Sequence, residues 1–271
     1  MIRSGLGPFP WGLISYTPSM SRTAIVTGAS SGIGRATALK LSGDGFLVLA
    51  VGRNERALSD VCGEIERAGA KAVPLAADVT SDEGPARIVD RALAAGGGID
   101  ALVNAAGIIA SGGVVETDDA GWDTMMDVNV RAPFRLIRQA AASLAERRGA
   151  VVNVSSVAGT RAFPGVLSYC VSKAAVDQLT RCAALDLAPR GVRVNAVNPG
   201  VVVTNLHRRS GMDETKYASF LERSTTTHPL GRTGTPEEIA DLIAFLVSPS
   251  SAWMTGDTIG IDGGRHLTCL R

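Results

Sequence analysis

The sequence lacks the charge imbalance and the long apolar segments that indicate nucleic-acid or membrane proteins. It has 27 lysine and arginine residues against 26 aspartate and glutamate residues, which gives a net charge of +1. This balance leaves no basic surface for nucleic acid and no charged block for a membrane surface. No uninterrupted apolar run is long enough for a transmembrane helix. We therefore predict neither a nucleic-acid partner nor a membrane partner.

Histidine and cysteine are scarce, and aromatic residues make up only 4% of the chain. The three histidines are scattered without metal-ligand spacing, so we predict no metal site. None of the four cysteines forms a CxxC pair. If Cys170 and Cys182 share a helix, they lie about 18 Å apart, which is too far for a disulfide. We expect reduced thiols and a cytoplasmic location.

The first 20 residues differ from the rest of the chain. They contain several glycines and prolines around a weak apolar centre, which is unlike the clean apolar run of a signal peptide. We expect residues 1–20 to be a disordered extension or the result of an upstream start, with Met20 opening the folded part. Residues 21–271 are expected to form one domain.

The sequence does contain a regular alternation of short apolar runs and helical patterns. Strands are expected at 23–27, 46–51, 72–76, 101–103, 151–154, 192–197 and 258–261, and helices at 33–42, 55–68, 84–95, 121–146, 166–187 and 236–247. Apolar strands separated by helices are typical of a parallel sheet covered on both faces. The pattern predicts an α/β fold, a single doubly wound Rossmann-like domain with a sheet of about seven parallel strands.

One long segment interrupts this alternation. Residues 201–232 lie between the sixth expected strand and the last expected helix, and they mix polar, basic and aromatic side chains without a strand pattern. An insertion of this length is typical of a lid or binding loop. A packing excursion or an oligomer contact is the alternative.

A glycine-rich segment stands where the first expected strand turns into the first expected helix. Residues 27–34 read TGASSGIG. Glycine permits a tight turn and lets the backbone approach a pyrophosphate at the helix N-terminus. The sequence therefore predicts a dinucleotide site that includes Gly28, Ser30, Ser31, Gly32, Ile33 and Gly34.

The end of the second expected strand indicates which dinucleotide binds. Many NAD enzymes place Asp or Glu about twenty residues beyond the glycines, where it binds the ribose 2′-hydroxyl. Here residues 51–54 read VGRN, without a carboxylate. Arg53 is placed to face a 2′-phosphate, although a solvated arginine at a helix start is the alternative. NADP(H) is the preferred cofactor, and NAD(H) remains possible.

Tyr169 and Lys173 stand four residues apart in an expected helix, so their side chains share one face. The ordinary pKa of a phenol is about 10, and a nearby ammonium group favours the phenolate. The pair therefore indicates a tyrosine that exchanges protons near neutral pH.

Further short motifs complete a resemblance that covers residues 21–265. They are ADV at 77–79, VNAAG at 103–107, Asn129, Ser156, NPG at 198–200 and Thr204. With the glycine loop and the Tyr169/Lys173 pair, they resemble the motifs of the classical short-chain dehydrogenases/reductases. This chain has Val103 where the family often has a first asparagine. The resemblance implies hydride transfer between NADP(H) and a carbonyl or secondary-alcohol substrate, by a homotetramer.

The resemblance also implies a role for each matching catalytic residue. Tyr169 is the expected general acid or base, and Lys173 stabilises its phenolate and binds the nicotinamide ribose. Ser156, thirteen residues before Tyr169, is the expected partner of the substrate oxygen, and it is preferred over Ser155. Asn129 is expected to pass protons to the lysine through water.

The remaining matches are expected to bind the cofactor. Asp78 is expected near the adenine, with a helix cap near Ser81 as its alternative, and Asn104 is expected also to join the central strands. The implied contacts are Asp78 and Val79 at the adenine, Asn104, Ala105 and Gly107 at its ribose, and Pro199, Gly200, Val202 and Thr204 at the nicotinamide and the phosphates.

Pro133 lies four residues after Asn129 and has no N–H group. We therefore expect the Asn129 carbonyl to be free, at a helix kink, and able to hold a water. A kink without a catalytic role is the alternative.

The substrate class stays open at the level of sequence. The expected pocket combines apolar residues (Ile108, Ile109, Val157, Phe163, Leu167 and Met212) with basic ones (Arg161, His207, Arg208 and Arg209). The apolar set suits a hydrophobic carbonyl compound, whereas the basic set, unless solvated, suits an acidic substrate or an acyl-carrier partner. A 3-oxoacyl thioester, sugars, polyols and steroids remain candidates, and a non-catalytic cofactor-binding sensor is the remote alternative.

Overall fold

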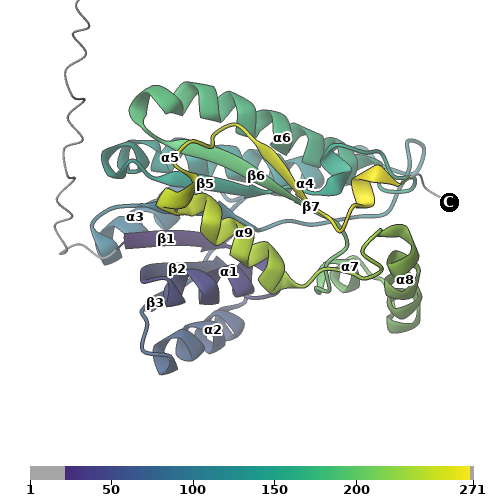
Figure 1. The fold of residues 1–271 in the computed structure, drawn as a ribbon, viewed down its shortest axis with the longest axis horizontal. Coiled ribbons are helices and arrows are strands. Elements are labelled where there is room, and N and C mark those ends of the chain that lie inside the picture. Colours follow the sequence, from purple (N-terminus) through teal and green to yellow (C-terminus); the bar gives the residue numbers. More distant parts are fainter. Residues whose placement is uncertain (1–21, 269–271) are drawn as a thin grey trace, which may run out of the picture.

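The protein is described by a computed structural model that covers residues 22–268 (Figure 1). Seven strands form one sheet in the order β3-β2-β1-β4-β5-β6-β7, and every neighbouring pair is parallel. The strands are β1 (Arg22–Thr27), β2 (Phe46–Gly52), β3 (Ala72–Ala76), β4 (Ala101–Asn104), β5 (Ala150–Val154), β6 (Arg193–Pro199) and β7 (Thr258–Ile261). The predicted doubly wound sheet is confirmed. The expectations for residues 1–20 and for Cys269 lie outside the described residues.

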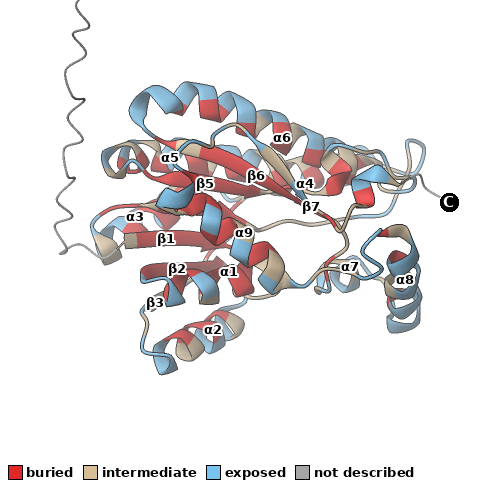
Figure 2. Cartoon of the chain, in the orientation of Figure 1, coloured by how far each residue is buried: buried red, intermediate tan, exposed pale blue. Residues whose placement is uncertain are grey.

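Helices cover both faces of this sheet, as Figure 2 shows by the burial of the central strands. One core cluster joins the sheet to α1 (Gly32–Gly43), α2 (Glu55–Arg67) and α9 (Pro236–Val247). A second joins the opposite face to α3 (Gly84–Gly96), α5 (Ala132–Arg147) and α6 (Leu167–Leu187). Because both faces are covered, the strands are apolar at nearly every position.

The helix expected at 121–146 is divided into three parts. α4 (Asp119–Met126) leads into a π-helical turn (Asp127–Arg131), and α5 follows. The Ala132 amide donates to the Asp127 carbonyl, five residues back. Pro133 supplies no amide for an ordinary helical bond at this point, and a π turn lets the chain continue without a break.

The segment 201–232, which we expected to be a lid or binding loop, is partly helical, and its role as a lid remains a prediction. It contains α7 (Leu206–Arg209) and α8 (Glu214–Thr227), and Asp213 caps α8 by accepting from the Lys216 amide at 2.8 Å. Figure 1 shows both helices beyond the end of the sheet, on the side where the strands end.

The strand order reverses between β1 and β4. From β1 the chain continues to β2 and β3 on one side of the sheet, and from β4 it continues to β5, β6 and β7 on the other side. At such a switch point the loops after the strands separate and leave a crevice. Gly34 lets α1 begin close to β1 here, because a Cβ on Gly34 would lie 2.4 Å from the Gly28 carbonyl oxygen. The glycine is therefore required for the approach of helix and strand.

Candidate active site

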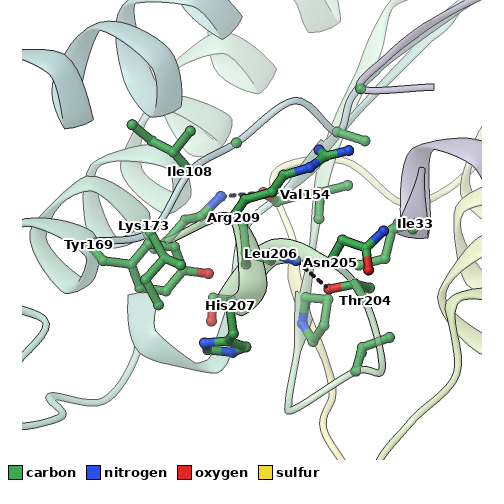
Figure 3. Close-up of a pocket in the computed structure, with 18 of the residues that line it drawn as sticks. Ile33, Ile108, Val154, Tyr169, Lys173, Thr204, Asn205, Leu206, His207 and Arg209 are labelled. Carbon is green, nitrogen blue, oxygen red and sulfur yellow. Dashed lines mark hydrogen bonds between the residues drawn. The ribbon is translucent and has the colours of Figure 1, made fainter. Parts of the chain in front are cut away.

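A cavity of about 890 Å³ opens at the carboxyl ends of the strands. The glycine-rich loop and the helices α7 and α8 are among the segments that line it. Figure 3 shows side chains from α6, α7 and β5 converging on this space.

The structure brings almost all of the predicted site residues to this cavity. The lining includes Gly28, Ser30, Ser31, Gly32, Ile33, Gly34, Arg53, Asp78, Val79, Ala105, Gly107, Ser156, Tyr169, Lys173, Pro199, Gly200, Val202 and Thr204. Asn104 and Asn129 are not part of the lining. Both are buried behind it, with exposed fractions of 4% and 1%.

Asn104 joins the central strands, as expected. Its side-chain amide donates to the Asn153 side-chain oxygen at 2.9 Å, between β4 and β5. Asn153 in turn donates to the Thr180 hydroxyl of α6 at 2.9 Å. Asn104 therefore joins the central strands to the helix that carries Tyr169 and Lys173, and its contact with the cofactor's ribose remains a prediction.

At the glycine-rich end, backbone and side chains form a cradle that suits a dinucleotide. Gly28 and Gly32 have φ angles of +67° and +55°, which favour glycine. The Asp78 carboxylate accepts from the Thr80 amide at 2.9 Å and from its hydroxyl at 2.7 Å, and these bonds lower the pKa of Asp78. The alternative of a helix cap by Asp78 is not what the structure shows, since Ser81 accepts from the Gly84 amide instead.

Tyr169 and Lys173 lie on one face of α6, as their spacing predicts, and both are buried. The Lys173 amine donates to the Val154 carbonyl at 2.8 Å and lies 5.7 Å from the centroid of the Tyr169 ring. This bond holds α6 against the end of β5, and it is drawn in Figure 3.

The pKa of Tyr169 shifts in the direction opposite to our expectation. Burial raises it, and a hydrogen bond with the Ser156 side chain lowers it by less. Burial also lowers the pKa of Lys173 to about 8, while the charge of Asp177 opposes that shift. Desolvation disfavours both charged forms, the phenolate of Tyr169 and the ammonium group of Lys173.

Ser155 and Ser156 have different surroundings. The Ser155 hydroxyl donates to the Lys173 carbonyl at 3.1 Å and is therefore engaged within the α6 contact. The Ser156 oxygen accepts from the Ala158 amide at 3.1 Å, and its hydroxyl faces Tyr169. These positions favour Ser156 as the residue beside a substrate oxygen.

Sequence reasoning missed a buried link behind the catalytic residues. Asn198 donates both to the Ser156 carbonyl at 3.1 Å and to the Asp177 carboxylate at 3.0 Å. Asp177 follows Lys173 by four residues on α6, and burial raises its pKa. A carboxyl four residues beyond the lysine was the available signal, although the partner Asn198 is known only from the fold.

Asn129 connects three segments through its side chain. Its oxygen accepts from the Ile108 amide at 2.9 Å, and its amide donates to the Ile108 carbonyl at 3.0 Å and to the Ser172 hydroxyl at 3.0 Å. The π turn thus joins the loop after β4 to α6. A free Asn129 carbonyl remains a prediction.

The substrate end of the cavity differs in part from the expected pocket. Ile108, Ile109, Val157, Phe163, His207 and Arg209 line it, whereas Arg161, Leu167, Arg208 and Met212 do not. The unexpected lining residues include Thr124, Val128, Phe220, Arg223 and Arg265. Arg208 instead pairs with Glu214, the first residue of α8.

Within residues 22–268, no cluster of three or more His, Cys, Asp or Glu side chains is arranged to hold a metal ion. Over the same range, no helix combines the length and apolar character that crossing a membrane requires.

The comparison with known proteins agrees with this geometry. A family model described as "Enoyl-(Acyl carrier protein) reductase" matches residues 28–266. The chain belongs to the short-chain dehydrogenase/reductase family. Members of this family are NAD(P)-dependent oxidoreductases, and the cleft described above carries the family's motifs.

Three similar proteins illustrate the relationship. The 3-oxoacyl-(acyl-carrier-protein) reductase FabG of Thermotoga maritima is 37% identical over 244 residues, which cover 90% of this chain and 97% of that protein. A short-chain dehydrogenase/reductase of unknown function from Caenorhabditis elegans, solved with cofactor, is 34% identical with a TM-score of 0.86, over 92% of this chain and 96% of that one. Actinorhodin polyketide ketoreductase, solved as a variant with NADPH, is 32% identical with a TM-score of 0.85, over 92% and 98%.

The burial of Lys173 predicts a cost in stability. In the folded chain its pKa is about 8, against an ordinary value of 10.5, so the ammonium form is disfavoured by folding. We expect Lys173→Met to raise the free energy of unfolding at pH 7 by about 1–3 kcal/mol, partly offset by the unpaired Val154 carbonyl.

The difference in the free energy of unfolding between Lys173→Met and the wild type should shrink as the pH rises. Between about pH 8 and pH 10.5 the unfolded wild-type chain binds more protons than the folded chain, so wild-type stability increases with pH relative to the variant. Urea unfolding of both proteins at pH 7 and pH 10 measures the difference. If the difference in unfolding free energy did not change with pH, the lowered pKa of the buried Lys173 ammonium group would be contradicted.

Proposed function

We propose that this protein transfers a hydride between NADP(H) and a carbonyl or secondary-alcohol substrate, with Ser156, Tyr169, Lys173 and Asn129 as its catalytic set. The observation that carries the proposal is the buried Tyr169/Lys173 pair, which lines the same cavity as the glycine-rich loop. A cofactor on the loop and a substrate at the lid would meet at this pair.

The chain's own residues fit the cofactor. Gly28 to Gly34 offer backbone amides at the start of α1 for a pyrophosphate, and Asp78 lies at the far end of the cavity for the adenine. Bound there, NADP(H) would supply or accept the hydride, which is chemistry that no side chain provides.

Tyr169 is suited to give a proton to the substrate oxygen. Because burial raises its pKa, the phenol stays protonated at neutral pH, as a general acid in carbonyl reduction must. The Ser156 oxygen already accepts from the Ala158 amide, so its own hydrogen is available for the substrate oxygen or for Tyr169.

Lys173 and Asn129 support this proton transfer. The positive charge of the ammonium group stabilises the phenolate that forms after Tyr169 gives up its proton. Asn129 lies behind the cavity and holds Ile108 and Ser172, beside the lysine's helix. We assign it to the water-mediated path that returns a proton to Lys173.

The substitution Tyr169→Phe tests the proposed acid. It keeps the ring but removes the transferable proton, so we expect kcat to fall by several orders of magnitude and NADPH affinity to change little. Turnover by absorbance at the nicotinamide band and NADPH binding by fluorescence measure the two effects. Near-normal turnover in the variant would contradict the assignment.

Arg53 supports NADP(H) over NAD(H). It is exposed at the end of β2 and lines the cavity, while Asn54 beside it caps α2 by accepting from the Ala57 amide at 3.0 Å. A guanidinium group there can pair with a 2′-phosphate, and no carboxylate competes in the sequence VGRN. The printed description of the ketoreductase with NADPH also favours this cofactor.

Arg53→Ala tests the cofactor preference. We expect kcat/KM with NADPH to fall about tenfold or more and kcat/KM with NADH to change less than about threefold, because only NADPH carries the 2′-phosphate. Both constants are measured with one carbonyl substrate. Equal losses with the two cofactors would show that Arg53 does not distinguish them.

The substrate class has two main candidates. The FabG relative and the apolar side chains Ile108, Ile109, Val157 and Phe163 favour a 3-oxoacyl thioester. NAD-linked oxidation of a sugar, polyol or steroid is the alternative for the same cavity. A panel of ketones and alcohols separates them, and silence across the panel despite tight NADPH binding would indicate a non-catalytic sensor.

We also propose a homotetramer. β7 is an edge strand, and Trp253, which precedes it, is 100% exposed. Apolar side chains on α5 and α6 are also exposed, though less completely. Large exposed apolar groups near an open sheet edge are typical of an interface between subunits. Light scattering should give four times the 28.0 kDa of one chain. A particle of 28.0 kDa would contradict the proposal.

A further inference from the structure

A charged side chain that the catalytic set does not use lines the substrate end of the cavity. Arg265 lies in the 3-10 turn Arg265–Leu267 that follows β7, and only 6% of its surface is exposed. A buried arginine is costly unless its charge is paired, so its partners need to be identified.

The partners within the chain are weak. One guanidinium nitrogen donates to the Thr268 hydroxyl at 2.9 Å, and the guanidinium carbon lies 5.2 Å from the centroid of the Phe163 ring. Within residues 22–268 no salt bridge joins Arg265 to a carboxylate. The Asp262 carboxylate, three residues earlier, is instead engaged by the amides of Gly264 and His266 and by the His266 ring.

The side chains around Arg265 are mostly positive. Burial and the charge of Arg161 lower the pKa of Arg265, and the charge of Asp262 opposes these two effects. Arg209 of α7 and Arg223 of α8 line the same cavity, and the single carboxylate among the described lining residues is Asp78. An anion beside Arg265 would therefore meet more positive than negative charge.

Phe163 connects this guanidinium group to the surroundings of Tyr169. The Phe163 side chain packs against the apolar cluster of Met125, Ala158 and Tyr169, and the Arg265 guanidinium group lies over its ring. Ser156, Tyr169 and Arg265 all line the same cavity. One molecule in this cavity can therefore be contacted by the proposed acid and by the guanidinium group.

We propose that the substrate carries a carboxylate that the Arg265 guanidinium binds, while Ser156 and Tyr169 hold the carbonyl or hydroxyl oxygen. The substrate is then an oxo acid or the corresponding hydroxy acid, not a neutral ketone. The geometry of a guanidinium group matches a carboxylate in two parallel hydrogen bonds. This inference rests on the proposed function and narrows its substrate class.

The test compares oxo acids with their methyl esters, which keep the carbonyl but lose the charge. Acetoacetate, levulinate and 5-oxohexanoate and their esters are assayed with NADPH on the wild-type protein. We expect kcat/KM for the best acid to exceed that for its ester at least tenfold. Arg265→Gln should lower kcat/KM for this acid about a hundredfold, chiefly through KM, and change that for the ester less than about threefold.

Two further variants control for charge and folding. Arg161→Gln removes a neighbouring positive charge that does not line the cavity. The Arg161 side chain donates to the His266 carbonyl. We expect this variant to lower kcat/KM for the acid less than about threefold. Arg265→Lys keeps the charge and should fall between the wild type and Arg265→Gln. If Arg265→Gln does not fold, Arg265→Lys is compared with the wild type in its place.

A binding measurement separates this inference from the proposed function. Butyrate with NADPH should raise the melting temperature of the wild type but not that of Arg265→Gln, and methyl butyrate should protect neither. Turnover without preference for the acid, or equal losses for acid and ester, would overturn the inference alone. If neither these oxo compounds nor any member of the panel of ketones and alcohols turns over, the proposed function fails, and butyrate binding still decides the role of Arg265.

Discussion

The hydrogen bond from the Lys173 amine to the Val154 carbonyl is the contact on which the rest of the site depends. It fixes α6 against the end of β5, and in doing so it places Tyr169 beside Ser156. The bond also keeps an ammonium group out of water, which folding alone does not favour. The structure therefore gives up stability in order to hold a charge next to a phenol.

A buried network stabilises this arrangement from behind. Asn198 links the Ser156 carbonyl to Asp177, and Asn104 and Asn153 link β4 and β5 to Thr180 of α6. The strands supply the asparagines as donors, and the acceptors are Asp177 and Thr180 of α6, Asn153 of β5 and the Ser156 carbonyl. Because each amide has a partner on a different element, the end of the sheet and the catalytic helix keep one relative position.

The sequence was sufficient for the sheet, because seven apolar runs with helical patterns between them allow few other arrangements. It was also sufficient for most of the cavity, since the glycine loop and Tyr169/Lys173 are local patterns. The π turn was not predictable from periodicity, which does not distinguish it from an α-helix. Asp177 and Arg265 were missed because their importance depends on partners distant in sequence, Asn198 and Phe163.

The cavity is assembled from both ends of the described chain. The glycine loop that lines it begins at Gly28, whereas Arg265, which also lines it, follows the last strand, β7. Thr268 extends this closure by donating to the Thr227 carbonyl of α8 at 3.0 Å. Synthesis must therefore pass β7 before the last wall of the cavity exists, and a product that stops ahead of β7 would hold a nucleotide cradle with no complete pocket beside it.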